Sequence, residues 1–319
     1  MPERHFIIDC DTAEDDILSL ISLLAKGVKV HALTVVEGNV EFETEVNNAL
    51  WAINFLRDNG IDIEDLKVYK GSSRPLIKDF KTVEEVHGRS GLGEISPLVK
   101  NTSFLGEEDA STAIINLSKK YEMEFLAISP LTNLALAYLR DPSVVQRIKR
   151  VYIMGGAVYA RGNITPVAEY NFWVDPDAAQ IVVNEFKETI TLAPWEVAVK
   201  NAIDQDTFDR LSTLGTMLSS LYKDMYSFYR QFSSKMQGMR GNPHPDVITT
   251  AVALDKDIAV DVRQENVNVE NCDCESRGLS IVDYVGPGHV RKKEWNAEVV
   301  YDINYYAFTV FLESVLKWF

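Results

Sequence analysis

Short apolar runs rich in β-branched residues alternate with amphipathic segments through the first two thirds of the chain. The apolar runs span residues 5–9, 28–36, 124–129, 151–156 and 189–194, and each has the length and composition of a buried strand. Between them, apolar residues recur three and four positions apart, which is typical of helices that pack on a sheet. This alternation predicts βαβ units and an open, mostly parallel, Rossmann-like α/β sheet flanked by helices.

Nothing in the sequence divides the chain into separate domains. It contains no internal repeat, no low-complexity tract and no linker rich in proline or glycine. Residues 207–237 predict a long helical stretch, and the residues from Ile258 onward predict further strands and a closing helix. We therefore expect one domain over residues 1–319, with a helical embellishment at about 205–240.

The charge of the chain argues against some classes of partner. The 319 residues include 32 Lys and Arg and 47 Asp and Glu, which gives a formal net charge of −15. Binding to nucleic-acid phosphates or to an anionic membrane needs a positive surface, so we expect neither partner. No apolar run approaches the roughly 20 residues of a membrane span, and the N-terminus lacks a signal segment, so we expect a cytoplasmic protein.

Three cysteines, Cys10, Cys272 and Cys274, are too few for a disulfide framework in a chain of this length. Cys272 and Cys274 lie in a polar stretch with no second pair that would complete a zinc site. We expect them to be two reduced thiols near the start of a strand.

Five acids lie within eight residues where the first predicted strand ends, in the sequence DCDTAEDD (9–16). Asp15 and Asp16 fit the first turn of a following helix, where the helix dipole favours acids. Asp9 and Asp11, at the mouth of an apolar strand, have no such explanation. Carboxylates this crowded repel one another unless a cation lies among them, and Ca²⁺ collects carboxylate, carbonyl and water oxygens. The segment therefore predicts a site for a hard divalent cation.

A second polar segment, GNITPVAEYN (162–171), leaves the end of another predicted central strand. Asn163, Glu169 and Asn171 offer amide and carboxylate groups there, in a stretch with little helix or strand pattern. Plain solvation of a loop would look similar, but ligands of open parallel sheets bind beyond the carboxyl ends of the strands. Because Asn and Glu side chains recognise vicinal hydroxyls well, we expect a sugar ligand.

Four shorter segments are less specific candidates. EGN (37–39) closes the second predicted strand, and the polar residues of SPLTN (129–133) could simply cap a helix. HGRSGLG (87–93) lacks the lysine of a phosphate-binding loop and is either a lid or a flexible surface turn. NPHPD (242–246) precedes a helical pattern, in which Asp246 is equally suited to be the N-cap.

Taken in order, these segments resemble the calcium-dependent, inosine–uridine-preferring nucleoside hydrolases, a family of N-ribohydrolases. DCDTAEDD is similar to the family's N-terminal signature, D-x-D-P-G-x-D-D. Matches to later family segments follow in the family's order and spacing: EGN, HGRSGLG, SPLTN, IMGGA (153–157), GNITPVAEYN and ESRGLSIVD (275–283). The resemblance runs from Ile7 to about Asp283. It implies the nucleoside hydrolase fold, a ribonucleoside substrate and an assembly of two or four identical chains.

The resemblance also implies a role for each matching residue. Asp11, Asp16 and Asp246 would bind Ca²⁺ through their carboxylates, and Ile128 would bind it through its backbone carbonyl. Asp11 would also be the general base that acts on a calcium-bound water. The residues implied to bind the ribose are Asp15, Asn39, Met154 (beneath the sugar), Asn163, Glu169, Tyr170 and Asn171.

These implied roles agree with the chemistry of N-glycosidic hydrolysis. The reaction passes through an oxocarbenium-like ribosyl state, and a pocket lined with carboxylates and other oxygens stabilises the positive charge that develops there. A bound Ca²⁺ lowers the pKa of its water, so Asp11 needs only to remove a proton at close range.

The chain departs from the family pattern where the leaving base would be protonated. Many members have a histidine directly before the last metal aspartate, whereas this chain has Pro245 there and His244 one place earlier. We expect His244 to be either the acid for the leaving base or a histidine on a surface turn.

Two further departures concern the active-site loops and the base. Thr12-Ala13 replaces the Pro-Gly turn of the signature, and Trp195-Glu196 stands where the family commonly has Leu-Asp. Four aromatic residues could stack on a base or could simply be packing residues: Trp173, Trp195, Tyr226 and Tyr229.

The sequence is also compatible with two other functions. Asp9 and Asp11 also resemble the D-x-D-x start of haloacid-dehalogenase-type phosphatases, with Asp9 as nucleophile and Mg²⁺ as metal, but the acidic pair expected after a later strand is missing. A non-catalytic nucleoside- or ribose-binding protein on the same fold is the second alternative. We expect a ribonucleoside hydrolase, because a binding protein has no need of the set formed by Asp11, Asp15 and Asp16.

Overall fold

The structure is a computed structural model that describes residues 3–63, 65–159, 161–187, 189–283 and 294–319. Its centre is an eight-stranded sheet with the strand order β3-β2-β1-β4-β5-β6-β10-β7. All neighbouring strands run parallel except β7, which is antiparallel to β10 at one edge. The predicted open, mostly parallel sheet is therefore confirmed.

The central strands of the large sheet are short and largely buried, as βαβ connections require, whereas the edge strands β3 and β7 are more exposed. Their bounds are β1 (His5–Cys10), β2 (Lys29–Val35), β3 (Lys67–Lys70), β4 (Met123–Ala127), β5 (Ile148–Met154), β6 (Ile190–Ala193), β7 (Ala259–Glu265) and β10 (Ala297–Ile303). A separate two-stranded hairpin consists of β8 (Val267–Val269) and β9 (Ser280–Val282).

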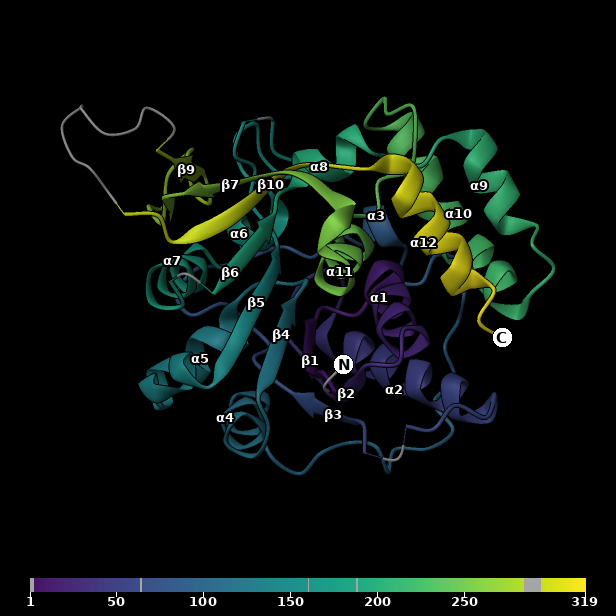
Figure 1. The fold of residues 1–319 in the computed structure, drawn as a ribbon, viewed down its shortest axis with the longest axis horizontal. Helices are drawn as coiled ribbons and strands as arrows, with labels where there is room; N and C mark the ends of the chain where they lie inside the picture. The colour runs from purple at the N-terminus through teal and green to yellow at the C-terminus, as the bar shows by residue number, and fades with distance from the viewer. Residues whose placement is uncertain (1–2, 64, 160, 188, 284–293) are drawn as a thin grey trace.

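Helices cover both faces of the sheet (Figure 1). Their bounds are α1 (Glu14–Ala25), α2 (Phe42–Asp58), α3 (Glu84–His87), α4 (Ala110–Lys120), α5 (Thr132–Arg140), α6 (Tyr170–Val174), α7 (Pro176–Glu185), α8 (Trp195–Lys200), α9 (Gln205–Ser212), α10 (Met217–Lys235), α11 (Pro245–Leu254) and α12 (Tyr305–Leu316). Short 3₁₀ turns follow α5 (Pro142–Gln146) and α11 (Lys256–Ile258).

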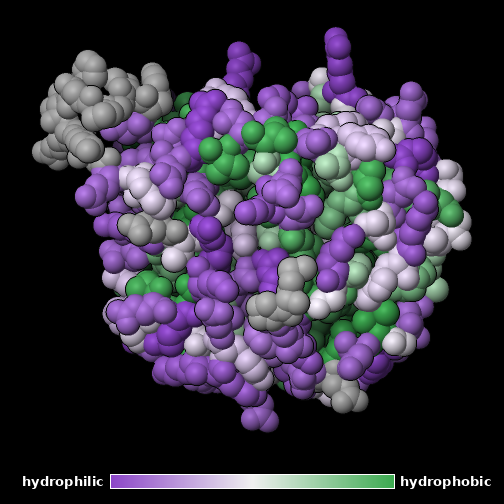
Figure 2. Space-filling view, in the orientation of Figure 1, coloured by the Kyte–Doolittle hydropathy of each residue, from purple (hydrophilic) through white to green (hydrophobic). Residues whose placement is uncertain are grey.

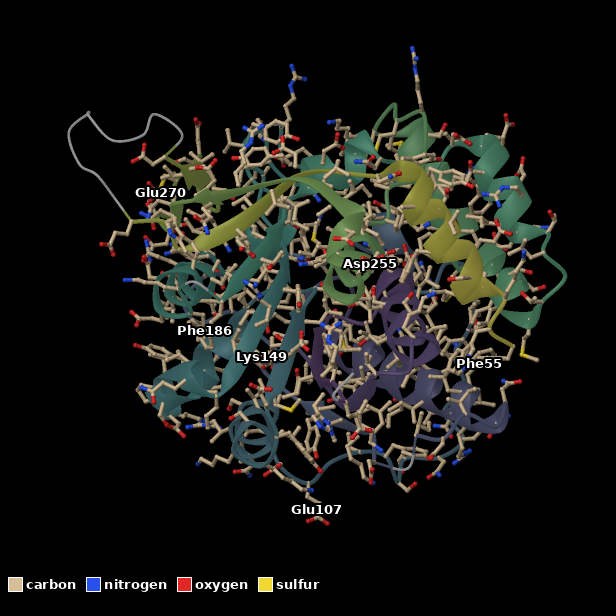
Figure 3. All side chains as sticks on the ribbon, viewed as in Figure 1. Phe55, Glu107, Lys149, Phe186, Asp255 and Glu270 are labelled. Carbon is tan, nitrogen blue, oxygen red and sulfur yellow. A yellow bond between two sulfur atoms is a disulfide. The ribbon has the colours of Figure 1, made fainter. Side chains whose placement is uncertain are left out.

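Two hydrophobic cores fill the space between the sheet and these helices. One lies beneath α1, α2, α10, α11 and α12, and the other lies beneath α4, α5 and α7. Phe186, at the end of α7, belongs to the second core and is 1% exposed (Figure 3). The outer face in Figure 2 is mostly hydrophilic, with apolar side chains in small patches. In the described part of the chain, no helix has the length and apolar character needed to cross a membrane.

The helical prediction for residues 207–237 is only partly right. The stretch is divided into α9 and α10 at Gly215, whose φ of 78° ends any continuous helix. A Cβ at Gly215 would meet nothing within 4 Å, so this turn lies in open space.

The prediction of two reduced thiols at Cys272 and Cys274 is wrong for this structure. Their sulfur atoms form a disulfide in the segment between β8 and β9. The backbone there brings the two Cα atoms to 5.4 Å, a separation that a disulfide can bridge. Sequence separation alone did not indicate this bend.

Candidate active site

A pocket of about 160 Å³ opens at the carboxyl ends of β1, β2, β4 and β5. Ten of the predicted site residues line it: Asp11, Asp15, Asn39, Ile128, Met154, Asn163, Glu169, Tyr170, Asn171 and Asp246. They come from segments far apart in the chain, which the parallel strands bring to one edge of the sheet. Asp16 and His244 are not among the lining residues that the described structure gives for this pocket.

Asp11 lies at the floor of the pocket and is 1% exposed. Its Oδ2 accepts a hydrogen bond of 3.1 Å from the Asn39 N–H, and the Asn39 side-chain amide donates to the Asp11 carbonyl, also at 3.1 Å. Gly38 is necessary for this approach, because a Cβ there would lie 2.0 Å from Asp11 Oδ2. The EGN segment is thus the backbone cradle for Asp11.

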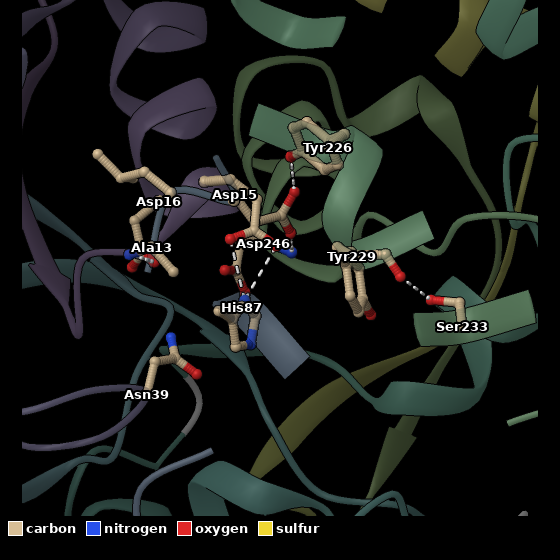
Figure 4. A network of polar contacts seen from close by, with 12 residues as sticks. Ala13, Asp15, Asp16, Asn39, His87, Tyr226, Tyr229, Ser233 and Asp246 are labelled. Atoms are coloured by element: carbon tan, nitrogen blue, oxygen red, sulfur yellow. Dashed lines mark hydrogen bonds and ion pairs between the residues drawn. The ribbon is translucent and has the colours of Figure 1, made fainter. Parts of the chain in front are cut away.

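Asp15 and Asp246 are joined at the start of two helices, α1 and α11 (Figure 4). Asp15 Oδ2 accepts the Asp246 N–H at 2.7 Å, and Asp15 Oδ1 accepts the Tyr226 hydroxyl. Burial raises the pKa of Asp15 to about 7, although both hydrogen bonds oppose the shift. Asp15 therefore positions the N-terminus of α11, and with it the carboxylate of Asp246.

Asp16 lies behind these residues and is 3% exposed. Its Oδ2 accepts the Ala13 N–H at 2.8 Å and so caps α1, as the sequence suggested for one of the acids. Burial raises the pKa of Asp16 to about 8, and the charge of Asp15 adds to the shift. Its other oxygen, Oδ1, is buried without a hydrogen-bond partner among the described residues.

These carboxylates fit a hard divalent cation. Within the part of the chain that the structure describes, no three acidic, histidine or cysteine side chains converge into a ready-made ligand cluster. However, burial raises the pKa of Asp11 and of Asp246, and the charge of Asp16 adds to both shifts, so these carboxylates repel one another. The unpartnered Oδ1 of Asp16 and the neighbouring carboxylates are the oxygen ligands that Ca²⁺ prefers.

The segment after β5 places Glu169, Asn171 and Asn163 around the opposite wall. Glu169 accepts the Gly156 N–H through Oε2 and the Asn171 N–H through Oε1, each at 2.8 Å. Asn163 Oδ1 accepts the Tyr170 N–H at 2.8 Å. Burial raises the pKa of Glu169 to about 7, although three backbone N–H groups oppose the shift. Polar side chains held this rigidly suit the recognition of a polyhydroxyl ligand.

Tyr170 and Met154 complete this wall in different ways. The Tyr170 hydroxyl donates to the Gly38 carbonyl at 2.7 Å, which ties α6 to the cradle of Asp11. Met154 is 3% exposed, and its sulfur lies 3.3 Å from the Asn171 amide nitrogen. The ring of Tyr170 lines the pocket while its hydroxyl is occupied within the fold.

His244 is a buried residue rather than a histidine on a surface turn. It is 0% exposed, its Nε2 lies 3.0 Å from the Tyr222 hydroxyl, and its Nδ1 lies 2.9 Å from the Asn242 carbonyl. Its ring stacks on Tyr226 with 4.4 Å between the centroids. Burial lowers the pKa of His244 to about 4.

His87 is the pocket residue that sequence reasoning missed. Its side chain is 15% exposed and lines the pocket beside Tyr229, with 5.5 Å between the ring centroids. It was visible only as the first residue of HGRSGLG, a segment that follows no strand. Trp195 and Phe232 also line the pocket, so this end is aromatic. Of the other aromatic candidates, Tyr226 bonds to Asp15, and Trp173 packs under Arg277.

The HGRSGLG segment is neither a lid nor a flexible surface turn in this structure. Leu92 is 0% exposed, and the Asn48 side-chain amide bridges the Ser90 and Thr12 carbonyls at 2.7 and 2.9 Å. Gly93, at a φ of 62°, packs so closely on α10 that a Cβ would lie 2.6 Å from the Met225 carbonyl oxygen. The segment thus fixes α3 and His87 against α10 and the acidic turn.

Asp9 does not belong to the pocket. It is 0% exposed, and its Oδ1 accepts hydrogen bonds from Thr34 at 2.5 Å and from Asn133 at 2.8 Å. Burial raises the pKa of Asp9 to about 7. A carboxylate that is fully buried on a central strand in this way cannot be the nucleophile that the phosphatase alternative requires.

Comparison with known proteins agrees with this geometry. The chain matches the family described as inosine–uridine-preferring nucleoside hydrolase over residues 6–309. It is 29% identical to the pyrimidine-specific ribonucleoside hydrolase RihA of Salmonella enteritidis over 98% of each chain. It is 31% identical to an uncharacterised protein of Schizosaccharomyces pombe over 87% of this chain and 88% of the relative.

Solved structures show the same fold. A plant nucleoside hydrolase, PpNRh1, superposes with a TM-score of 0.90 at 24% identity and covers 99% of both chains. A purine-preferring ribonucleoside hydrolase from Gardnerella vaginalis superposes with a TM-score of 0.87 at 25% identity and covers 98% of both chains. The two alternative functions, a haloacid-dehalogenase-type phosphatase and a non-catalytic binding protein, are therefore rejected. The chain belongs to the inosine–uridine-preferring nucleoside hydrolase family and is a hydrolase that acts on N-glycosyl bonds.

Proposed function

We propose that the enzyme hydrolyses ribonucleosides with a purine base, a pyrimidine base or both to free base and ribose. The observation that carries the proposal is one pocket that combines the carboxylates of Asp11, Asp15 and Asp246 with the Asn and Glu side chains of two other segments. Cleavage of the N-glycosyl bond leaves positive charge on the ribosyl group, and buried carboxylates favour that charge.

We also propose that Ca²⁺ is the metal of this family member, held by Asp11, Asp16, Asp246 and the Ile128 carbonyl. The unpartnered oxygen of Asp16 and the mutual repulsion of the acids support this choice. When bound, the cation would supply positive charge that lowers the pKa of a neighbouring water, together with coordination for ribose hydroxyls.

Asp11 is the residue suited to remove the proton of the attacking water. Its Oδ2 is oriented by the Asn39 N–H, and the carboxylate lines the pocket where the ribose would lie. Asn39, Asn163 and Asn171 are suited to the ribose hydroxyls, because each is oriented by a bond to the backbone. In this arrangement Glu169 holds the loop and adds negative charge beside the sugar.

The aromatic end of the pocket is suited to the base. Trp195, Tyr229 and Phe232 offer ring surface, and His87 offers a ring nitrogen to protonate the leaving base. Both nitrogens of His244 have partners within the fold, which favours His87 over His244 for this step. RihA is named as pyrimidine-specific and the Gardnerella enzyme as purine-preferring, so relatives of both kinds share the fold.

A substrate panel tests the proposal. Inosine, adenosine, guanosine, uridine and cytidine are each incubated with the protein, and free base and reducing sugar are measured, beside the matching 2′-deoxyribonucleosides. We expect at least one ribonucleoside to be cleaved and its 2′-deoxy form to react at least about 100-fold more slowly, because the polar wall loses a hydroxyl partner. No cleavage of any ribonucleoside would refute the function, and equal rates for the two sugars would refute the ribose contacts.

A further inference from the structure

Glu14 is a buried acid at the edge of the pocket to which the proposed reaction gives no role. It is the first residue of α1, between Ala13 and the acids Asp15 and Asp16, and is 0% exposed. Its Oε1 and Oε2 lie 2.9 and 3.0 Å from Nδ1 of His87, a residue 73 positions later in the chain. Both carboxylate oxygens therefore face one imidazole nitrogen.

Helix capping does not account for this arrangement. An acid in the first turn of α1 is favoured by the helix dipole, but Asp15 and Asp16 already provide two, and Asp16 caps the Ala13 N–H. A third acid that is fully buried beside them adds repulsion and a desolvation cost. Such a residue is stable only with a partner, and its partner here is His87.

The contact determines which nitrogen of His87 is available to a ligand. Two carboxylate oxygens can only accept, so Nδ1 carries the hydrogen. Nε2 has no hydrogen-bond partner among the described residues and is the nitrogen left for a ligand of the pocket that His87 lines. Stacking on Tyr229, with 20° between the ring planes, limits the tilt of the imidazole. Gly88, at a φ of 80°, ends α3 directly after His87. The ring is thus held by Glu14 at one nitrogen and by Tyr229 on one face.

The negative charge of the Glu14 carboxylate also prepares His87 to act on a leaving base. Burial alone would lower the pKa of His87, but the Glu14 carboxylate in contact with its ring raises this pKa above its ordinary value. A histidine that keeps its second proton can give it to a departing base.

We propose that Glu14 is a positioning residue that holds His87 with Nε2 toward the leaving base. The proposal rests on the proposed function and adds one requirement to it. Water forms the new bond to C1′ and loses its proton to Asp11, while the C1′–N bond breaks and its electron pair goes to the base. His87 supplies the proton that the base needs. Asp11 then releases its proton to solvent and His87 takes one up from solvent, so both residues are restored and one water is consumed in each turnover.

Comparison of two leaving groups tests the proposal. The nucleoside that the panel identifies as best needs a proton on its base, whereas 4-nitrophenyl β-D-riboside releases a stable phenolate without one. We expect Glu14→Ala to lower kcat on the nucleoside about 100-fold, with KM little changed, because general-acid catalysis contributes about that factor. On the 4-nitrophenyl riboside, we expect a change of no more than about threefold.

Other variants separate positioning from structure. Glu14→Gln keeps an acceptor for Nδ1–H but loses the negative charge, so it should recover part of the nucleoside rate that Glu14→Ala loses. Glu14→Leu replaces Glu14→Ala if the smaller side chain prevents folding. Glu84→Ala removes a neighbouring acid on α3 that does not line the pocket, and it should leave both rates unchanged. Calorimetric titration with Ca²⁺ alone should give the same affinity for the parent and for Glu14→Gln.

The possible failures are distinguishable. A parent that cleaves neither substrate refutes the proposed function. A parent that cleaves both, with a Glu14→Ala variant that slows both equally or neither, refutes the positioning role. A loss of Ca²⁺ affinity in Glu14→Gln that parallels the loss of both activities refutes it as well, since Glu14 would then act on the metal site.

Discussion

Each acid of the pocket depends on a specific neighbour for its position. Gly38 lets the Asn39 N–H reach Asp11, and the Asp246 N–H holds Asp15. Where such a neighbour is a backbone N–H group, the carboxylate accepts a hydrogen bond and keeps its negative charge. The pocket therefore concentrates negative charge where the proposed reaction develops positive charge on the sugar.

The base assigned to Asp11 can be tested with a substitution of nearly equal shape. We expect Asp11→Asn to lower kcat/KM about 1,000-fold, because the amide accepts no proton from water. Initial rates of base release measure the effect, and circular dichroism checks the fold. Asp206→Asn, which changes an exposed acid in the first turn of α9, is the matched control and should leave the rate unchanged. A variant that keeps its rate within about tenfold of the parent would show that Asp11 is not the base.

Individual site residues could be predicted only where strand ends and a known motif coincided. Asp11, Asp15, Asn39 and Asn171 follow strands that the apolar pattern located, and the structure places them in one pocket. Glu14 and His87 could not be paired in this way, because 73 residues separate them and no periodicity links α1 to α3. Even the burial of His244 depends on Tyr222 and Tyr226, which lie on α10.

Among the elements, the glycine loop between α3 and residue 94 shows how packing decides what sequence pattern leaves open. Its glycines suggested flexibility, but Gly88, Gly91 and Gly93 adopt positive φ values of 80°, 74° and 62° in a loop that packs against α2 and α10. Glycine here permits close approach, which holds the loop in place.

Substitution at Gly93 tests this interpretation. We expect Gly93→Ala to lower the free energy of unfolding by about 2–3 kcal/mol, because the new Cβ meets the Met225 carbonyl oxygen in addition to the strain of positive φ. Gly215→Ala is the control, since its φ is also positive but a Cβ there meets nothing within 4 Å. Its cost should be about 1 kcal/mol. Urea denaturation of both variants measures the difference, and equal losses would contradict the close packing of the loop.

A pH effect is expected at the pairing of β1 and β2. His31 on β2 is 5% exposed, lies 2.9 Å from His5 through its Nε2, and stacks on Tyr121. Burial, with the charges of His5, Lys29 and Lys120, lowers the pKa of His31 to about 4, although Asp65 opposes the shift. In the unfolded chain, His31 has its ordinary, higher pKa and takes up a proton below about pH 6.5. In the folded protein, His31 stays neutral at the same pH. Stability therefore falls as the pH falls through this window.

His31→Phe keeps the ring against Tyr121 and removes the titrating group. Between pH 7 and 4.5, we expect the variant to lose about 2 kcal/mol less unfolding free energy than the parent. Urea denaturation at a series of pH values gives both curves, and comparison with the parent cancels the contributions of the other acids. Parallel curves for the two proteins would contradict the lowered pKa.

The elements themselves were predicted unevenly. The five apolar runs correspond to β1, β2, β4, β5 and β6, which are neighbours in the middle of the sheet and are mostly buried. β3 and β7 lie at the sheet edges, where half-exposed strands lack a continuous apolar run. The break between α9 and α10 depends on a single backbone conformation at Gly215. The apolar pattern thus locates central strands better than edges and turns.

At the scale of the whole molecule, the apolar cores that stabilise the fold and the polar residues of the pocket lie in different places around the sheet. Two apolar cores lie on its two faces, and the polar residues of the pocket gather at one edge, beyond the strand ends. The fold therefore tolerates a cluster of buried carboxylates at that edge. A formal charge of −15 for the chain makes a cation at the pocket more favourable still.

The proposed calcium-dependent hydrolysis is tested by the rate of base release from the best nucleoside of the panel. The rate is measured after treatment with a chelator and again after addition of Ca²⁺. We predict that chelation reduces the rate to background and that Ca²⁺ restores it, because in the proposed site the water and the ribose would bind through the cation held by Asp11, Asp16 and Asp246. A rate that stays unchanged after complete removal of divalent metal would contradict the proposed calcium site.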